Sequence, residues 1–274
     1  MLKNITGVSK TSAGPLFLRA RAGIPYAKEI AELTDATSML GEIVDPVHHP
    51  LMERYFARYM ELRFMSLSMA IHMLGYERVF EVAAGFATRG LMMSEHIGFD
   101  YLETDMPPVI EAKQILVREM LPFKRVNLSF APADALNLES LLKAKSLLRH
   151  GPLALVHEGL LTYFPHKEKQ QKQQVLENFR ATLRRGDVWV TPDIITREQL
   201  ERTTALSKEY LSKWPTFYPF EDEDEAADMI TQAGFSIESL SPLHLVPYLT
   251  SEVPDDPRVR EILAHEELWV MRPR

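Results

Sequence analysis

The stretch of residues 78–90 constrains the fold more than any other part of the chain, because it has the order of a buried strand, a glycine turn and a helix. Residues 79–82 include a short apolar run of β-favouring side chains. Gly85 follows this run, and glycine permits backbone conformations and a close ligand approach that a side chain would obstruct. In open α/β sheets, ligands bind at the carboxyl ends of the strands, where such a turn lies. The stretch therefore predicts an α/β sheet with a ligand site at this turn.

Glu81 narrows the kind of ligand, because a carboxylate at the apolar end of a strand is costly unless a partner meets it. A cationic ligand group would be such a partner. A nicotinamide dinucleotide site requires three glycines, and only Gly85 satisfies the pattern, since Ala83 and Thr88 stand at the other two positions. S-adenosylmethionine has no pyrophosphate and carries an amino group, a carboxylate and a sulfonium, so it fits the acid and the small-residue turn best. An ordinary strand-turn-helix corner without a ligand is the remaining alternative.

Composition excludes several classes of protein. The chain has 274 residues, no cysteine and a net charge of −7, and its basic residues are scattered among acids. Without cysteine there is no disulfide, thiolate nucleophile or cysteine metal site, and the doublet His48-His49 before Pro50 is typical of a loop. No apolar run reaches the ~18 residues of a membrane span, and the first residues lack an apolar signal core. We expect a cytoplasmic protein with no metal, no membrane and no nucleic-acid partner, and the sequence leaves a homo-oligomer open.

Two further acids follow predicted strands. Asp105 ends the strand expected over residues 100–105 and lies 20 residues past Gly85, where a carboxylate holds a ribose diol in related sheets. Asp134 follows the strand expected over residues 125–130. Asp134 either accepts a hydrogen bond from the adenine amino group or caps the next helix, for which Asn137 or a neighbour is the predicted N-cap.

Glu158 and Gly159 follow the fourth predicted strand, over residues 152–157. A carboxylate and a glycine at this end of a strand again indicate the ligand site. His157 and Tyr163 are the nearest candidates for a general base. A histidine in a buried strand is more often a core residue, and this interpretation of His157 is preferred.

A long helix is expected over residues 51–74, where apolar and aromatic side chains recur at three- and four-residue spacings before Gly75. Arg54, Arg58 and Arg63 lie along this helix. They form either a solvated face paired with glutamates of the same helix, or a face from which one planar guanidinium reaches the cofactor carboxylate.

The same reasoning predicts the remaining elements. Shorter helices are expected over residues 16–22, 26–32, 91–96, 107–122, 138–148, 167–183 and 197–213, and further strands over residues 187–191, 235–240 and 266–271. The helix over 197–213 is followed by the aromatic residues Trp214, Phe217, Tyr218 and Phe220, which either wall a substrate pocket or pack a cap.

Four motifs, in order and at matching spacings, resemble the leucine carboxyl methyltransferase family, including its bacterial branch that methylates polyketide carboxyl groups. The matching runs are residues 81–89, residues 103–107 with Lys113, residues 134–136 and residues 158–163. The resemblance implies a class I methyltransferase fold, a single domain over 1–274 with a seven-stranded, mostly parallel sheet whose last strand is reversed. Its expected parts are a helical arm (1–74), a cofactor-binding core (75–194), a helical insertion after the fifth strand (195–234) and a final strand pair (235–274).

The resemblance also implies the roles of residues around S-adenosylmethionine. The loop at Gly85 would hold the methionine part, Asp105 the ribose and Asp134 the adenine amino group. Glu158 would meet the methionine amino group, and Arg58, with one residue of slippage, the cofactor carboxylate. The full set expected to bind the cofactor is Arg58, Glu81, Ala83, Gly85, Glu103, Asp105, Met106, Asp134, Ala135, Glu158 and Gly159. The chain departs from the family at two positions, with Ala83 in place of glycine and Ala87 in place of aspartate.

The expected reaction is methyl transfer to a carboxylate of a small, polyketide-like organic acid. Carboxylates are ionised at pH 7, so the acceptor needs no general base. A phenol acceptor would need one, and His157 or Tyr163 would then supply it. A protein C-terminal carboxyl methyltransferase and a catalytically inactive cofactor-binding protein are the two alternatives.

Overall fold

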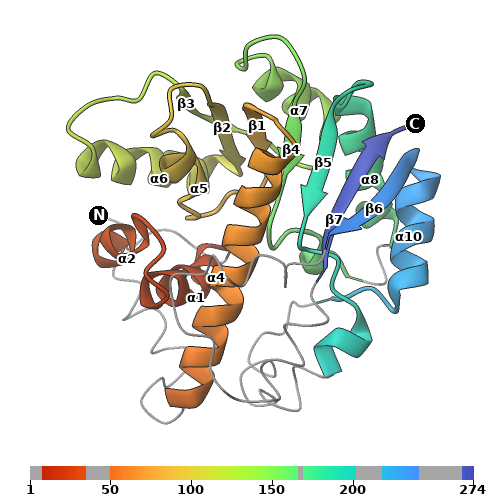
Figure 1. Cartoon of the computed structure of the whole chain (residues 1–274), viewed down its shortest axis with the longest axis horizontal. Helices are drawn as coiled ribbons and strands as arrows, with labels where there is room; N and C mark the ends of the chain where they lie inside the picture. Colours follow the sequence, from red (N-terminus) through yellow and green to blue (C-terminus); the bar gives the residue numbers. More distant parts are fainter. Residues whose placement is uncertain (1–7, 35–49, 166–168, 202–217, 241–266) are drawn as a thin grey trace.

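The computed structural model describes residues 8–34, 50–165, 169–201, 218–240 and 267–274 (Figure 1). Its centre is one seven-stranded sheet with the order β3-β2-β1-β4-β5-β7-β6. The strands are β1 (Arg78–Glu81), β2 (Asp100–Asp105), β3 (Leu128–Pro132), β4 (Ala154–Val156), β5 (Val188–Thr191), β6 (Phe235–Leu240) and β7 (Leu268–Pro273). Strands β1 to β5 pair in parallel, and β7 runs antiparallel to both β5 and β6. The predicted sheet with a reversed last strand is confirmed.

Helices cover both faces of the sheet (Figure 1). One face carries α1 (Val8–Arg21), α2 (Ala27–Thr34), α4 (Pro50–Met73), α5 (Arg89–Met93) and α6 (Pro107–Met120). The other carries α7 (Leu138–Lys145), α8 (Lys169–Thr182) and α10 (Glu223–Gln232).

Alternation along each strand separates the two cores, because successive side chains point to opposite faces. Val188 and Val190 of β5 pack on the α4 side, whereas Trp189 lies on the α8 side. There the Trp189 ring meets the ring of Phe179 at 5.5 Å between centroids, and that of Phe235 at 5.3 Å. Both faces of the sheet are buried, as is usual for parallel sheets.

Several element bounds differ from the prediction. The third strand begins at Leu128 rather than at residue 125, because the Leu128 amide donates to the Arg125 carbonyl at 3.4 Å and closes a turn before the pairing with β2 starts. The predicted helix over 91–96 begins two residues earlier, at Arg89. Of the predicted insertion helix, residues 197–201 are helical, and the rest of it, with Trp214 and Phe217, lies outside the described residues.

The described ranges contain neither a membrane-spanning helix nor a cluster of metal-ligating side chains. No helix in them is both long and apolar enough to cross a membrane. Within the same ranges, no three histidine, aspartate or glutamate side chains gather as a metal would require. The doublet His48-His49 lies outside the described residues.

Candidate functional site

The strand order reverses between β1 and β4, and the candidate site lies at the carboxyl edge of the sheet around this point. Strand β1 pairs with β2 on one side and with β4 on the other. Ligands bind at such a reversal in open α/β sheets. The predicted residues that follow these strands all meet at this edge, namely Ala83 and Gly85 after β1, Asp105 and Met106 at β2, Asp134 and Ala135 after β3, and Glu158 and Gly159 after β4.

The loop after β1 is tied to the end of β2. Ala83 and Gly85 both have positive φ, 55° and 49°. The Gly85 amide donates to Oδ2 of Asp105 at 2.7 Å, and the Met106 amide donates to Oδ1 at 2.7 Å. Burial raises the pKa of Asp105, and the two amides partly offset this. Asp105 therefore supports the positive-φ conformation of this loop, and no ligand is needed for that contact.

Asp134 is not the cap of the helix that follows it. The N-cap of α7 is Asn137, whose side chain accepts from the Ser140 amide at 3.1 Å. Oδ1 of Asp134 instead accepts from the Leu136 amide at 2.9 Å. The Asp134 side chain is therefore not the N-cap, although the Asp134 amide donates to the Ser140 hydroxyl in the first turn of α7 at 3.2 Å, and the predicted contact of Asp134 with adenine stays a prediction.

The cationic partner of Glu81 belongs to the chain itself. The Arg89 guanidinium, at the start of α5, donates to Oε1 of Glu81, and the Tyr101 hydroxyl donates to Oε2 at 2.8 Å. Arg89 is fully buried, with its guanidinium 4.7 Å from the ring centroid of Phe64. Burial alone lowers the pKa of Arg89, but Glu81 and Glu158 raise it above its usual value. The cation expected beside Glu81 is thus Arg89 rather than a group of the ligand.

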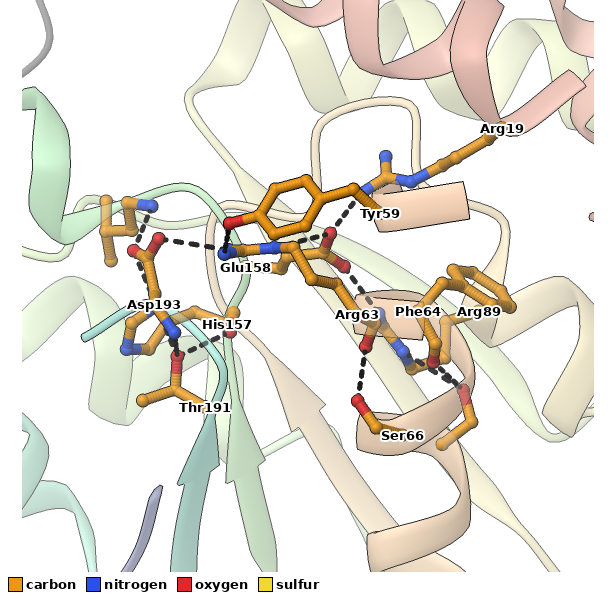
Figure 2. A network of polar contacts seen from close by, with 12 residues as sticks. Arg19, Tyr59, Arg63, Phe64, Ser66, Arg89, His157, Glu158, Thr191 and Asp193 are labelled. Carbon is orange, nitrogen blue, oxygen red and sulfur yellow. Dashed lines mark hydrogen bonds and ion pairs between the residues drawn. The ribbon is translucent and has the colours of Figure 1, made fainter. Parts of the chain in front are cut away.

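Glu158 is surrounded by three guanidinium groups from three helices (Figure 2). Nη2 of Arg19 lies 2.9 Å from Oε1, Nη2 of Arg89 lies 2.7 Å from Oε2, and Nε of Arg63 lies 3.6 Å from Oε1. Burial acts to raise the pKa of Glu158, but Arg19, Arg89 and Arg63 outweigh it and lower the pKa to about 2. Glu158 is therefore a charged carboxylate at neutral pH despite its burial.

Arg63, rather than Arg58, is the arginine of α4 that reaches this edge. Arg58 pairs with Glu61 of its own helix at 2.7 Å. Arg63 meets Glu158, and its Nη2 lies 3.4 Å from Oδ1 of Asp193. The side chain of Arg54 lies outside the described residues. Arg63 therefore lies beside Glu158, and the predicted contact of Arg58 with the cofactor carboxylate stays a prediction.

Glu103 has a different place from the other predicted site residues. Its Oε2 lies 2.7 Å from Nζ of Lys113, and its Oε1 accepts from the Gly90 amide at 3.1 Å. Burial raises the pKa of Glu103, against the opposing effect of Lys113. Both side chains are fully buried, so Glu103 fastens α5 and α6 to the sheet and presents no exposed atom to a ligand.

His157 is a core residue, in agreement with the preferred interpretation. It is fully buried, with ring centroids 5.6 Å from Trp189 and 5.5 Å from Phe179. Its Nδ1 lies 3.5 Å from Oδ2 of Asp193. The other candidate base, Tyr163, ends the 3-10 helix η2 (Leu161–Tyr163) and is partly exposed.

Four residues of this edge were not in the predicted site, namely Arg19, Arg63, Arg89 and Asp193. Asp193 had the same signal as Asp105 and Asp134, an acid just after a predicted strand. Arg89 closes the first family motif, and Arg63 was one of three candidates on its helix. Arg19 begins the stretch of residues 19–27 that resembles the N-terminal arm of the family, but the resemblance assigned it no role.

The fold resembles several solved methyltransferase structures. A protein of Thermobifida fusca described as a methyltransferase has a TM-score of 0.61 at 12% identity, over 97% of this chain and 94% of that one. Magnesium protoporphyrin IX methyltransferase of Synechocystis, solved with S-adenosylhomocysteine (SAH), has a TM-score of 0.53 at 12% identity, over 82% and 88%. PigF, also solved with SAH, has a TM-score of 0.51 at 10% identity over 77% of this chain, which spans only 54% of PigF. At these identities the likeness shows the fold alone.

A sequence comparison decides the family. No curated protein sequence matches the chain significantly. The sequence profile of the leucine carboxyl methyltransferase family matches residues 21–179, which is more than half of the chain and includes the loops after β1, β2, β3 and β4. The chain therefore belongs to the leucine carboxyl methyltransferase family.

Proposed function

We propose that the protein is an S-adenosylmethionine-dependent O-methyltransferase that converts a carboxylate of a small organic acid to its methyl ester. The observation that carries this proposal is the gathering of three acids at one sheet edge, Asp105, Asp134 and Glu158, beside the left-handed loop at Gly85. Each acid ends or follows a different strand, so together they line the path that an extended adenosine and amino-acid ligand would take. Family membership supports the same activity.

The residues fit the chemistry of the cofactor at both of its ends. Asp105 and Asp134 each accept from backbone amides and keep further lone pairs for ribose hydroxyls and the adenine amino group. At the other end, Glu158 offers a negative charge to the methionine ammonium, and Arg19 and Arg63 offer positive charge to its carboxylate. Nε of Arg19 is buried and has no hydrogen-bond partner among the described residues, so it is a spare donor at this place.

The site supports a reaction without a general base. When bound, S-adenosylmethionine supplies a methyl group activated by its sulfonium. A carboxylate acceptor is already ionised at pH 7. His157 is buried between aromatic rings and faces Asp193, so it is not placed to take a proton from an acceptor. The chain then contributes by aligning the acceptor carboxylate with the methyl group and the sulfonium. In well-oriented systems such alignment lowers the activation free energy by roughly 7–11 kcal/mol.

The test is incubation with methyl-labelled cofactor and a panel of carboxylic acids that includes a peptide with a free C-terminus. We expect label in a small acid, in a product that mild alkali hydrolyses, at a rate nearly flat from about pH 6 to 8. Asp105→Ala should reduce the labelling at cofactor concentrations near the wild-type Kd. A product that resists alkali, formed at a rate that follows a pKa near neutrality, would indicate hydroxyl methylation with Tyr163 as the candidate base. Labelling of the peptide alone would indicate a protein carboxyl methyltransferase.

A cofactor-binding protein without methyl transfer is the second candidate, and Ala83 favours it. Ala83 has a φ of 55° at a position where the family usually has glycine. Its methyl group also lies on the loop that would hold the methionine part. Binding of SAH by calorimetry, without label transfer to any acceptor, would support this candidate.

A further inference from the structure

Asp193 connects two parts of the candidate site that lie far apart in the sequence. It follows β5 and is fully buried. Its Oδ2 accepts from the amides of Leu160 and Leu161 at 2.6 and 2.7 Å. Its Oδ1 lies 3.4 Å from Nη2 of Arg63 on α4 (Figure 2).

Both connections lead to Glu158. Leu160 and Leu161 lie two and three residues after Glu158, and Gly159, which has a φ of 75°, lies between them and Glu158. Arg63 also meets Oε1 of Glu158 at 3.6 Å. The Asp193 carboxylate therefore positions both the loop after Glu158 and the Arg63 guanidinium.

The backbone of Asp193 is itself fixed. The Thr191 hydroxyl accepts from the Asp193 amide at 3.0 Å and donates to the His157 carbonyl at 2.9 Å. Nδ1 of His157 lies 3.5 Å from Oδ2 of Asp193. Burial acts to raise the pKa of Asp193, but His157, Arg63 and the Leu160 amide lower it, so the group is charged.

We propose that Asp193 is a positioning residue for the methionine end of the cofactor. It holds Glu158 and Arg63 at a fixed separation, so that the ammonium and the carboxylate of one amino acid are recognised together. A charged carboxylate is required, because it accepts on both oxygens, whereas an asparagine would turn a donor towards the donor of Arg63. This inference rests on the proposed function, since it concerns the same ligand.

The experiment compares Asp193→Asn with a matched control at the opposite end of β5. Asp187, just before β5, is also buried, accepts from the amides of Leu153 and Arg184 at 2.9 and 2.8 Å, and lies 3.5 Å from Nζ of Lys145. It occupies the opposite end of β5, away from the candidate site. Asp187→Asn therefore imposes a similar structural change without touching Glu158 or Arg63.

Two ligands separate positioning from folding. SAH carries the amino acid end, and 5′-methylthioadenosine lacks it. We expect Asp193→Asn to weaken SAH roughly 10- to 100-fold, as for hydrogen bonds to charged groups, and to leave the affinity for methylthioadenosine within about twofold of wild type. Asp187→Asn should lower the melting temperature about as much as Asp193→Asn does, but it should leave the affinities for both ligands unchanged. Equal affinities for SAH in the two variants would overturn the inference.

A second variant tests whether Asp193 acts through Arg63. Arg63→Lys keeps the charge but removes the fork that meets two acids. The double variant, Asp193→Asn with Arg63→Lys, should bind SAH at most about twofold more weakly than whichever single variant binds it more weakly. The reason is that the free-energy losses of coupled residues do not add. Losses of affinity that multiply in the double variant would contradict this route.

A fallback variant is available if Asp193→Asn does not fold. Thr191→Val removes the hydroxyl that accepts from the Asp193 amide, and it should show the same ligand pattern to a smaller degree. Its failure to do so would count against the proposal. If wild-type protein binds neither ligand, the proposed function fails rather than this inference.

Discussion

At the scale of single residues, the loop after β1 depends on backbone conformations that most side chains resist. Ala83 is one of two described residues other than glycine with positive φ, the other being Tyr26. A left-handed conformation brings Cβ towards the following carbonyl oxygen and costs roughly 1–2 kcal/mol. The methyl group of Ala83 is therefore a source of local strain at the candidate site.

Replacing Ala83 with glycine should relieve this strain. We expect Ala83→Gly to raise the free energy of unfolding by about 0.5–1 kcal/mol, because the relief exceeds the entropy cost of glycine. Ala87→Gly is the matched control, since the backbone of Ala87 is not left-handed and the same change should destabilise by about 0.5–1 kcal/mol. Urea unfolding measures both. A destabilised Ala83→Gly variant would contradict the strain argument.

Alanine substitutions distinguish acids that bind the cofactor from residues that only stabilise the fold. Asp105→Ala and Asp134→Ala should each weaken SAH binding by roughly 1–3 kcal/mol, the cost of an unpaired polar group in the site. Asn137→Ala removes the N-cap of α7 and should cost about 1 kcal/mol of stability while SAH affinity stays unchanged. Calorimetry and thermal unfolding measure the two quantities. An unchanged affinity in Asp134→Ala would remove Asp134 from the cofactor site.

At the scale of elements, buried charges join helices to the sheet. Arg19 of α1, Arg63 of α4 and Arg89 of α5 all meet Glu158 after β4. A buried ion pair is costly to break by removing one partner, because the other charge is left without compensation. The arm, the long helix and the first loop therefore share one electrostatic centre.

This centre predicts a pH dependence of stability. The pKa of Glu158 is lowered to about 2 in the folded state, so its stabilisation is complete above the unfolded value of about 4.3 and is lost as pH falls towards 2. The contribution is about 3 kcal/mol. Glu158→Gln should flatten the free energy of unfolding between about pH 4.5 and 2.5. Glu32→Gln, at a side chain 68% exposed, is the control and should leave the profile unchanged. An unaltered slope in Glu158→Gln would show that other groups govern acid unfolding.

The contact between α5 and β2 leaves no room for a larger residue at Gly90. A Cβ there would lie 2.5 Å from Oε1 of Glu103, which is fully buried and paired with Lys113. We expect Gly90→Ala to destabilise by about 1–3 kcal/mol, as overpacking does. At Gly98 the nearest atom to a new Cβ is 3.8 Å away, so Gly98→Ala should be nearly neutral. Thermal unfolding of the two variants decides, and equal melting temperatures would contradict the packing argument.

At the scale of the whole molecule, the strand order places the loops after β1, β2, β3 and β4 side by side. A ligand that spans them contacts both halves of the sheet and binds only the folded chain. Such a ligand stabilises by mass action. SAH or S-adenosylmethionine at about 100 times its Kd should add about 2.7 kcal/mol and raise the melting temperature, whereas NAD at the same concentration should not. A shift with NAD alone would overturn the cofactor assignment.

The sequence by itself determined the seven-stranded sheet and indicated the sheet edge at which the candidate site lies. The bounds of β2 and β6 match the predicted ranges, because apolar alternation and flanking turns act locally. The acids at strand ends were also recognisable, since parallel strands bring their carboxyl ends to one edge wherever the helices lie.

Only the tertiary structure decided which charges meet. The sequence could not show that Arg89 satisfies Glu81, or that Arg63 meets Glu158. Arg63 and Asp193 are 130 residues apart, and Arg89 and Glu158 are 69 apart. Helical spacing places all the arginines of α4 within a few turns of one another, but the rotation of the helix on the sheet selects the one that points inward. That rotation is set by packing of the whole apolar face, so no local pattern carries it.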